Sequence, residues 1–208
     1  MIGLTFICFG FFNTDPLIRI LLGAKWASTE VPSLLSWYCC YILVIGINGI
    51  TEAFVYSVAP AAQIERLNRL LIVFSVCYTA LAVILVNHIG NTGLILANGI
   101  NMIMRIAVSV RFINTVFREN RGQAPNWGKV LPHRTVLAAF LGALGVSSIT
   151  YRVFYLSGVW QYAVLHVGIT AAFFVVVAGL VWVYERTFVR QLRSIISTRE
   201  IAVEIKKD

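Results

Sequence analysis

The stretch LLSWYCCYILVIGINGITEAFVYSV, residues 34–58, decides the fold of this 208-residue chain. It is mostly apolar and exceeds the ~20 residues that an α-helix needs to cross a bilayer. Asn48, Thr51 and Glu52 nevertheless interrupt it. A charge near the middle of a spanning helix costs at least ~2.5–3.5 kcal/mol, so such side chains normally face a polar or protein-lined interior. The stretch therefore predicts a membrane-spanning helix with one polar face.

The composition extends this prediction to the whole chain. Apolar residues make up 59% and charged residues 12%, with a mean hydropathy of +0.81, against roughly 45–50% and 25% in soluble domains. We predict an all-α, polytopic transmembrane helix bundle over residues 1–185. The complete spans are expected at 34–58, 68–86, 92–117, 134–155 and 160–184. A sixth, partial span at 1–12 is interpreted as the latter half of a helix, so we expect the chain to be a carboxyl-terminal portion of a longer protein.

The orientation follows from the 17 Lys and Arg residues, because basic segments near helix ends stay in the cytosol. If the spans alternate, one side holds only Arg19, Lys25 and Arg152, whereas most other basic residues lie on the opposite side. This predicts a cytosolic carboxyl terminus. The end of the chain, 186–208, fits a basic amphipathic tail on the cytosolic leaflet, or a topology anchor alone. The net charge of +8 thus indicates membrane lipid, and no nucleic acid, as a partner.

Two connections carry further information. Residues 13–33 combine an apolar stretch, 17–22, with Arg19 and the pair Lys25–Trp26, which suggests a short interfacial helix on the extracytoplasmic side. An ordinary loop fits equally well. The connection 88–92 is so short that the spans on either side of it are expected to form an antiparallel hairpin.

Helical spacing arranges the polar residues into two stripes. Asn48 and Glu52 share one face of the first complete span with Tyr41 and Tyr56. The third complete span carries a second stripe, formed by Asn98, Asn101 and Arg105. An ion pair between Glu52 and Arg105 is feasible, because the long arginine side chain bridges part of their difference in depth. The stripes predict either a polar cavity or a buried pair that fixes the helix register.

Other features argue against an enzyme. The four cysteines and three histidines form no metal-ligand spacing, and no glycine-rich loop suggests a nucleotide, so we expect no catalytic residue, metal or cofactor. Small residues, among them Gly46, Gly49, Gly142 and Gly145, predict either close helix contacts or local flexibility in a moving helix.

Two motifs add a resemblance. The run Asn48-Gly49-Ile50-Thr51-Glu52-Ala53-Phe54, and above all the run from Leu96 to Ile106, LANGINMIMRI, resemble segments of the Rft family of endoplasmic-reticulum membrane proteins. The resemblance extends over nearly the whole chain in the order of spans. It implies part of the two-lobed, exporter-type fold of the multidrug/oligosaccharidyl-lipid/polysaccharide exporter superfamily. An amino-terminal lobe would then be required in addition to this chain.

The resemblance also implies a function, namely translocation of a dolichol-diphosphate-linked oligosaccharide across the endoplasmic-reticulum membrane in support of N-glycosylation. In that function Arg105 would attract the diphosphate, and Glu52 would hold Arg105 between cargo visits. Hydroxyl groups of the cargo would hydrogen-bond to Asn48, Asn98 and Asn101. Two alternatives stay open: a non-transport scaffold or accessory factor of the glycolipid pathway, and an ion-coupled antiporter in which Glu52 is the coupling carboxylate.

Overall fold

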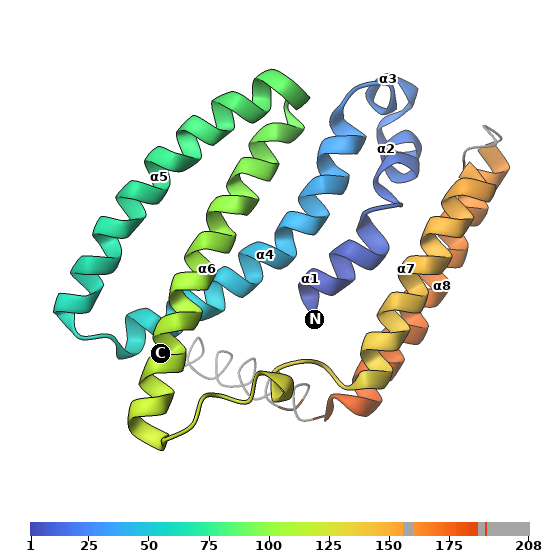
Figure 1. The fold of residues 1–208 in the computed structure, drawn as a ribbon. Helices are drawn as coiled ribbons and strands as arrows, with labels where there is room; N and C mark the ends of the chain where they lie inside the picture. The colour runs from blue at the N-terminus through green and yellow to red at the C-terminus, as the bar shows by residue number, and fades with distance from the viewer. Residues whose placement is uncertain (156–159, 187–189, 191–208) are drawn as a thin grey trace, which may run out of the picture. The chain divides into compact units, whose positions relative to one another are not determined.

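The computed structural model of the chain describes residues 1–155, 160–186 and 190 (Figure 1). The described residues are helical apart from turns and connections, and they contain no strand. The helices long and apolar enough to span a membrane are α4 (Val31–Val58), α5 (Ala61–Ile89), α6 (Thr92–Arg121), α7 (Arg134–Val153) and α8 (Trp160–Tyr184). The predicted all-α bundle with five complete spans is confirmed. The predicted tail, 186–208, lies almost wholly outside the described residues.

The largest difference from the predicted boundaries is in α5. It begins at Ala61, seven residues before the expected span, and its first turns carry Glu65, Arg66 and Arg69. The hydropathy pattern marks only the part of a helix that suits lipid, whereas backbone hydrogen bonds continue into the aqueous region. The salt bridge between Arg69 and Glu65, with side chains about 70% exposed, belongs to this extension.

The chain forms two compact units, of which the first covers residues 1–128. In this unit α6 packs against both α4 and α5 (Figure 1). The α5–α6 connection is a tight turn at Gly90, where φ is +66°, so α5 and α6 form the antiparallel hairpin that the sequence predicts. Because α5 returns the chain to its starting side, α4 and α6 run parallel to each other.

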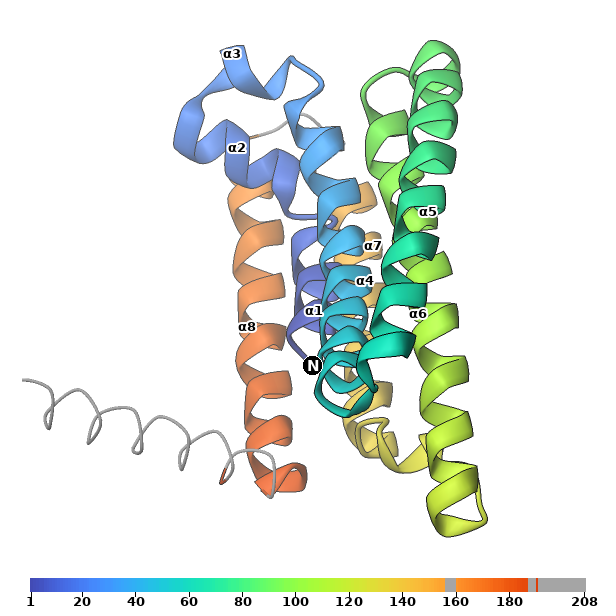
Figure 2. The same cartoon turned by 90° about the vertical axis from the view of Figure 1, so that its left-hand side faces the viewer.

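The chain before α4 forms a bent pair of helices. Helix α1 (Ile2–Thr5) continues into the π-helix η1 (Phe6–Gly10), and both contact α4. Helix α2 (Thr14–Leu22) then turns by 73° from that direction and is followed by α3 (Ala24–Ala27) (Figure 2). The predicted partial span, 1–12, thus corresponds to the first arm of a bent helix pair, and the connection 13–33 is partly helical.

The close helix contacts lie at other glycines than those predicted. Among the described residues, a Cβ atom at Gly46, Gly49, Gly142 or Gly145 would meet nothing within 4 Å. The close approaches are instead at Gly3 and Gly10, where α1 and η1 meet α4, and at Gly93, where a Cβ would overlap the backbone of Leu85 and Val86. Small-residue spacing on one helix does not show which face meets a neighbour.

The second unit, which begins at Lys129, contains the hairpin of α7 and α8. Its interface holds polar groups: His166 and Ser147 are fully buried, and the His166 Nδ1 atom lies 2.8 Å from the Thr150 hydroxyl. At the other end of the hairpin the His133 backbone N–H donates to the Glu185 carboxylate at 2.6 Å. The His133 ring also stacks on Tyr184.

Candidate functional site

The centre of the candidate site is an ion pair between α4 and α6. The Arg105 Nε and Nη2 atoms donate to the two carboxylate oxygens of Glu52, at 2.7 and 2.8 Å. This bidentate arrangement is the strongest form of a carboxylate–guanidinium contact. The side chains retain 18% exposure for Glu52 and 24% for Arg105. The pair thus neutralises two charges within the apolar bundle and stays accessible from one side.

Further polar contacts connect the same helices at other depths. The Asn98 amide donates to the Tyr41 hydroxyl at 2.6 Å. Towards the starts of α4 and α6, the Asn91 amide donates to the Glu30 carboxylate at 2.9 Å. These contacts and the ion pair form a seam along the parallel helices α4 and α6, which we call the polar seam.

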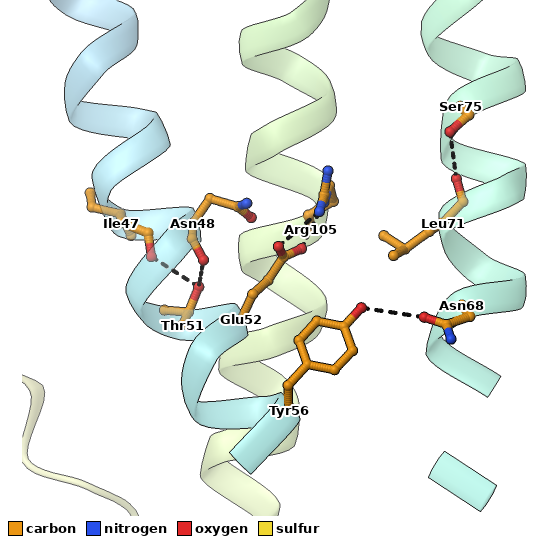
Figure 3. Close-up of polar contacts among 9 residues, drawn as sticks. All are labelled: Ile47, Asn48, Thr51, Glu52, Tyr56, Asn68, Leu71, Ser75 and Arg105. Carbon is orange, nitrogen blue, oxygen red and sulfur yellow. Dashed lines mark hydrogen bonds and ion pairs between the residues drawn. The ribbon is translucent and has the colours of Figure 1, made fainter. Parts of the chain in front are cut away.

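The polar seam also contains two buried amides with unsatisfied oxygens. Asn48 and Asn101 are only 6% and 9% exposed, and neither Oδ1 atom has a hydrogen-bond partner within the described residues. They lie one helical turn before Glu52 and Arg105, respectively, so they occupy the same interface (Figure 3 shows Asn48 beside the ion pair). A buried amide oxygen without a partner costs about 1–3 kcal/mol. Such an oxygen is therefore a ready acceptor for a bound hydroxyl group or water.

A cleft lies beside the ion pair, between α4, α5 and α6. Glu52, Tyr56, Arg105 and Ser109 supply its polar lining. The facing wall comes from α5 and is apolar, with Leu71 directed towards the ion pair (Figure 3). Its other α5 residues are Leu67, Leu70 and Phe74. Near the cleft the Tyr56 hydroxyl donates to the Asn68 Oδ1 atom at 3.3 Å, which connects α4 to α5.

The cleft is small in this conformation. Its internal space of about 20 Å³ holds about one water molecule. A phosphate group or sugar is several times larger, so its entry requires the Glu52 or Arg105 side chain, or α5 itself, to move. In this conformation the cleft is thus a narrow space with one charged and one apolar wall.

The five sequence-predicted residues all lie in the α4–α6 interface. Glu52 and Arg105 are brought together, Asn98 binds Tyr41, and Asn48 and Asn101 are buried, with amide oxygens that find no partner in the described part of the chain. Sequence reasoning missed the contribution of α5. Asn68 marks only the edge of a predicted span, and the leucines that line the cleft have the pattern of ordinary lipid-facing residues. Only their position opposite Arg105 distinguishes them.

The fold and the site together define a class. A chain with five helices long and apolar enough to span a membrane, and with a bidentate ion pair and two amide oxygens left unpaired by the described residues between two of those helices, is a multi-pass membrane protein with buried polar groups.

Comparison with known families gives the particular one. The model of the Rft protein family matches residues 1–195, so the chain belongs to this family. The proteins named Man(5)GlcNAc(2)-PP-dolichol translocation protein RFT1 include relatives from Mus musculus, 28% identical over 92% of the chain, and from Dictyostelium discoideum, 24% identical over 96%. The relative from Saccharomyces cerevisiae is 37% identical over 57% of the chain. The chain spans about a third of the length of the first two relatives, 35% and 33%. No solved structure matches the chain.

Proposed function

We propose that this chain is part of a protein that translocates a dolichol-diphosphate-linked oligosaccharide across the endoplasmic-reticulum membrane, in support of N-glycosylation. The observation that carries the proposal is the part-exposed Glu52–Arg105 pair at a cleft whose other wall is apolar. A lipid-linked sugar diphosphate combines an anionic group with a long apolar chain, and the two walls match these two parts. The names of the relatives supply the substrate class.

The geometry suggests a role for each charged residue. Arg105 binds the diphosphate through the same guanidinium nitrogens that now contact Glu52, because phosphate and carboxylate accept the same bidentate hydrogen bonds. Glu52 occupies this position between cargo visits, which avoids an uncompensated charge in the membrane. Cargo and carboxylate thus compete for one arginine, and no covalent bond changes.

The asparagines serve the sugar portion in this proposal. Asn48 and Asn101 gain hydrogen bonds from cargo hydroxyl groups when α4 and α6 separate, which satisfies the amide oxygens that are now unpaired. Asn98 takes part after release from Tyr41. Binding of the cargo therefore compensates for opening the interface.

The activity belongs to a larger protein than this chain. Since the relatives are about three times as long, we propose that transport also requires the amino-terminal lobe and the other parts that this chain does not match. We further propose the orientation predicted from charge, with a cytosolic carboxyl terminus and with the basic ends of α5 and α6 in the cytosol.

The test uses the full-length protein in liposomes that contain the dolichol-linked oligosaccharide, with a lectin outside that cannot cross the bilayer. The Arg105→Gln variant is expected to lose most of the lipid reorientation. The matched control is Arg111→Gln, because Arg111 lies exposed on the same helix outside the cleft. The double variant Glu52→Gln/Arg105→Gln removes both charges and separates loss of binding from loss of folding. Unchanged transport in the folded double variant would refute the role of Arg105.

The same liposomes separate the two alternatives. A scaffold or accessory factor does not speed reorientation by itself, so the wild-type protein would equal empty liposomes. An ion-coupled antiporter would respond to an imposed proton or sodium gradient and lose that response in Glu52→Gln. The proposed translocation is supported if the protein speeds lipid reorientation without any ion gradient and if Arg105→Gln, but not Arg111→Gln, abolishes this effect.

A further inference from the structure

We infer that α2 is a membrane-interface helix, seated in the lipid leaflet at the end of the first unit where α4 begins. The surface that α2 contacts is the lipid leaflet itself, at the level where head groups meet acyl chains. The inference concerns the lipid contacts of residues 14–26 and holds whatever cargo the protein carries.

The first observation is the elbow that fixes the direction of α2. Where the helix breaks, the Asn13 amide donates to the Phe9 carbonyl at 2.8 Å, and the Thr14 hydroxyl donates to the Phe11 carbonyl at 3.2 Å. The α4 residue Ser36 donates to the same Phe11 carbonyl at 2.8 Å and contacts the Thr14 hydroxyl. Asn13 and Thr14 are about 95% buried. Side chains thus satisfy the Phe9 and Phe11 carbonyls at the 73° bend, as a helix break near lipid requires.

The second observation is the depth of the elbow. Helix α4 has 28 residues and is therefore ~42 Å long, which exceeds the ~30 Å hydrocarbon core by ~12 Å, or ~6 Å at each end. Ser36 lies five residues after Val31, so it is ~7.5 Å from the start of α4. If α4 is centred in the bilayer, the elbow sits at the edge of the hydrocarbon. If α1 and η1 run along the membrane normal beside α4, then α2, which leaves them at 73°, runs close to the membrane plane.

The third observation is the amphipathic surface of α2. Ile18 packs inward, whereas Leu17, Leu21 and Leu22 are 38%, 75% and 57% exposed. Leu17 and Leu21 are four residues apart and form one apolar ridge, away from Arg19. Exposing such a ridge to water is unfavourable, and burying it in the acyl-chain region lowers the free energy.

The fourth observation is the chemistry of the residues directly after α2. Gly23, with φ of +86°, ends the helix, and α3 places an exposed Lys25 next to Trp26, which is 50% exposed. Tryptophan prefers the head-group level, and lysine beside it reaches lipid phosphates. Exposed leucines followed by a tryptophan and a lysine are the pattern of a helix at the head-group level of a lipid leaflet.

The experiment is site-directed spin labelling of the purified protein in vesicles of phosphatidylcholine with phosphatidylglycerol. Single cysteines replace Leu17, Leu21 or Arg19 in a background in which Cys40 and Cys77, the less buried native cysteines, are serine. Matched references are Val73, exposed on the membrane-spanning part of α5, and Gln123, exposed in the connection after α6. Accessibility of each label to oxygen, which enters lipid, is compared with that to a water-soluble nickel chelate.

We expect the oxygen-to-nickel ratio at Leu17 and Leu21 to approach that at Val73 and to exceed that at Arg19 several-fold. A ratio at Leu21 equal to that at Gln123 would place the ridge in water and overturn the inference. Protection of Leu21 from both reagents would also overturn it, because the ridge would then be covered by protein.

Discussion

Two regions of the molecule bury polar groups between apolar helices, and they differ in how those groups are satisfied. In the α7–α8 hairpin the fully buried His166 contacts the Thr150 hydroxyl at 2.8 Å, and the buried Ser147 and Thr170 also have partners. In the polar seam between α4 and α6 two buried amide oxygens lack partners within the described residues, and the ion pair stays part-exposed. The hairpin has the features of a structural contact, whereas the seam keeps acceptor atoms free, which is what the proposed cargo site requires.

The largest effect on stability is expected from one half of the ion pair. Glu52→Gln leaves Arg105 without its anion, and we expect a loss of ~2–3 kcal/mol of unfolding free energy in detergent. This is below the ~3–5 kcal/mol of fully buried pairs because the side chains are 18% and 24% exposed. Glu52→Gln/Arg105→Gln should recover most of the loss. If the single variant is as stable as wild type, the pair contributes nothing to the fold.

A smaller loss is expected at the turn that positions α6. Gly93→Ala forces a methyl group into the backbone of α5 at Leu85 and Val86, and we expect a cost of ~1–3 kcal/mol by thermal unfolding. Gly145→Ala in the α7–α8 hairpin is the control, since a Cβ there meets nothing within 4 Å. Equal effects of the two substitutions would mean that α5 and α6 do not approach as closely as described.

A substitution inside the α7–α8 hairpin should lower the free energy of unfolding less. His166→Leu removes one interhelical hydrogen bond with Thr150, a contact that averages ~0.6 kcal/mol in membrane proteins and reaches ~1.7 kcal/mol. We expect a stability loss in this range and unchanged reorientation of the glycolipid by the full-length protein. A selective loss of transport in a stable His166→Leu protein would move the functional site to the hairpin.

The smallest effect on stability, and the opposite sign, is expected for the unsatisfied amides. Asn48→Leu and Asn101→Leu remove buried oxygens to which no described residue donates, so the free energy of unfolding should be unchanged or rise by up to ~1 kcal/mol, while transport falls. Asn98→Leu is the matched control, because it breaks the bond to Tyr41 and should lower stability. A clear loss of stability in the Asn48 and Asn101 variants would show that these amides already have structural partners.

Much of the fold was predictable because lipid imposes simple rules. A spanning helix needs a long apolar run, so the five spans were found from hydropathy, and the short 88–92 connection correctly predicted the α5–α6 hairpin. Helical spacing also placed Glu52 and Arg105 on interior faces. Hydropathy marks only the part of a helix that lies in the membrane. The expected span 68–86 therefore began seven residues after the start of α5 at Ala61.

The sequence was less informative about contacts between helices. Gly46 and Gly49 suggested close packing, yet Gly93 provides it, since only the turn at Gly90 brings α5 against that residue. The unsatisfied oxygens of Asn48 and Asn101 were equally unpredictable, because hydrogen bonding depends on which neighbour faces each amide.

The sequence by itself determined that the chain crosses a membrane, where its helices do so, and that polar residues share helix faces, because these properties depend on composition and on the period of the α-helix. Only the tertiary structure decided that Arg105 binds Glu52, that α5 adds an apolar wall, and that two amides remain unpaired among the described residues. Those properties depend on the packing and register of separate helices, which no local pattern specifies.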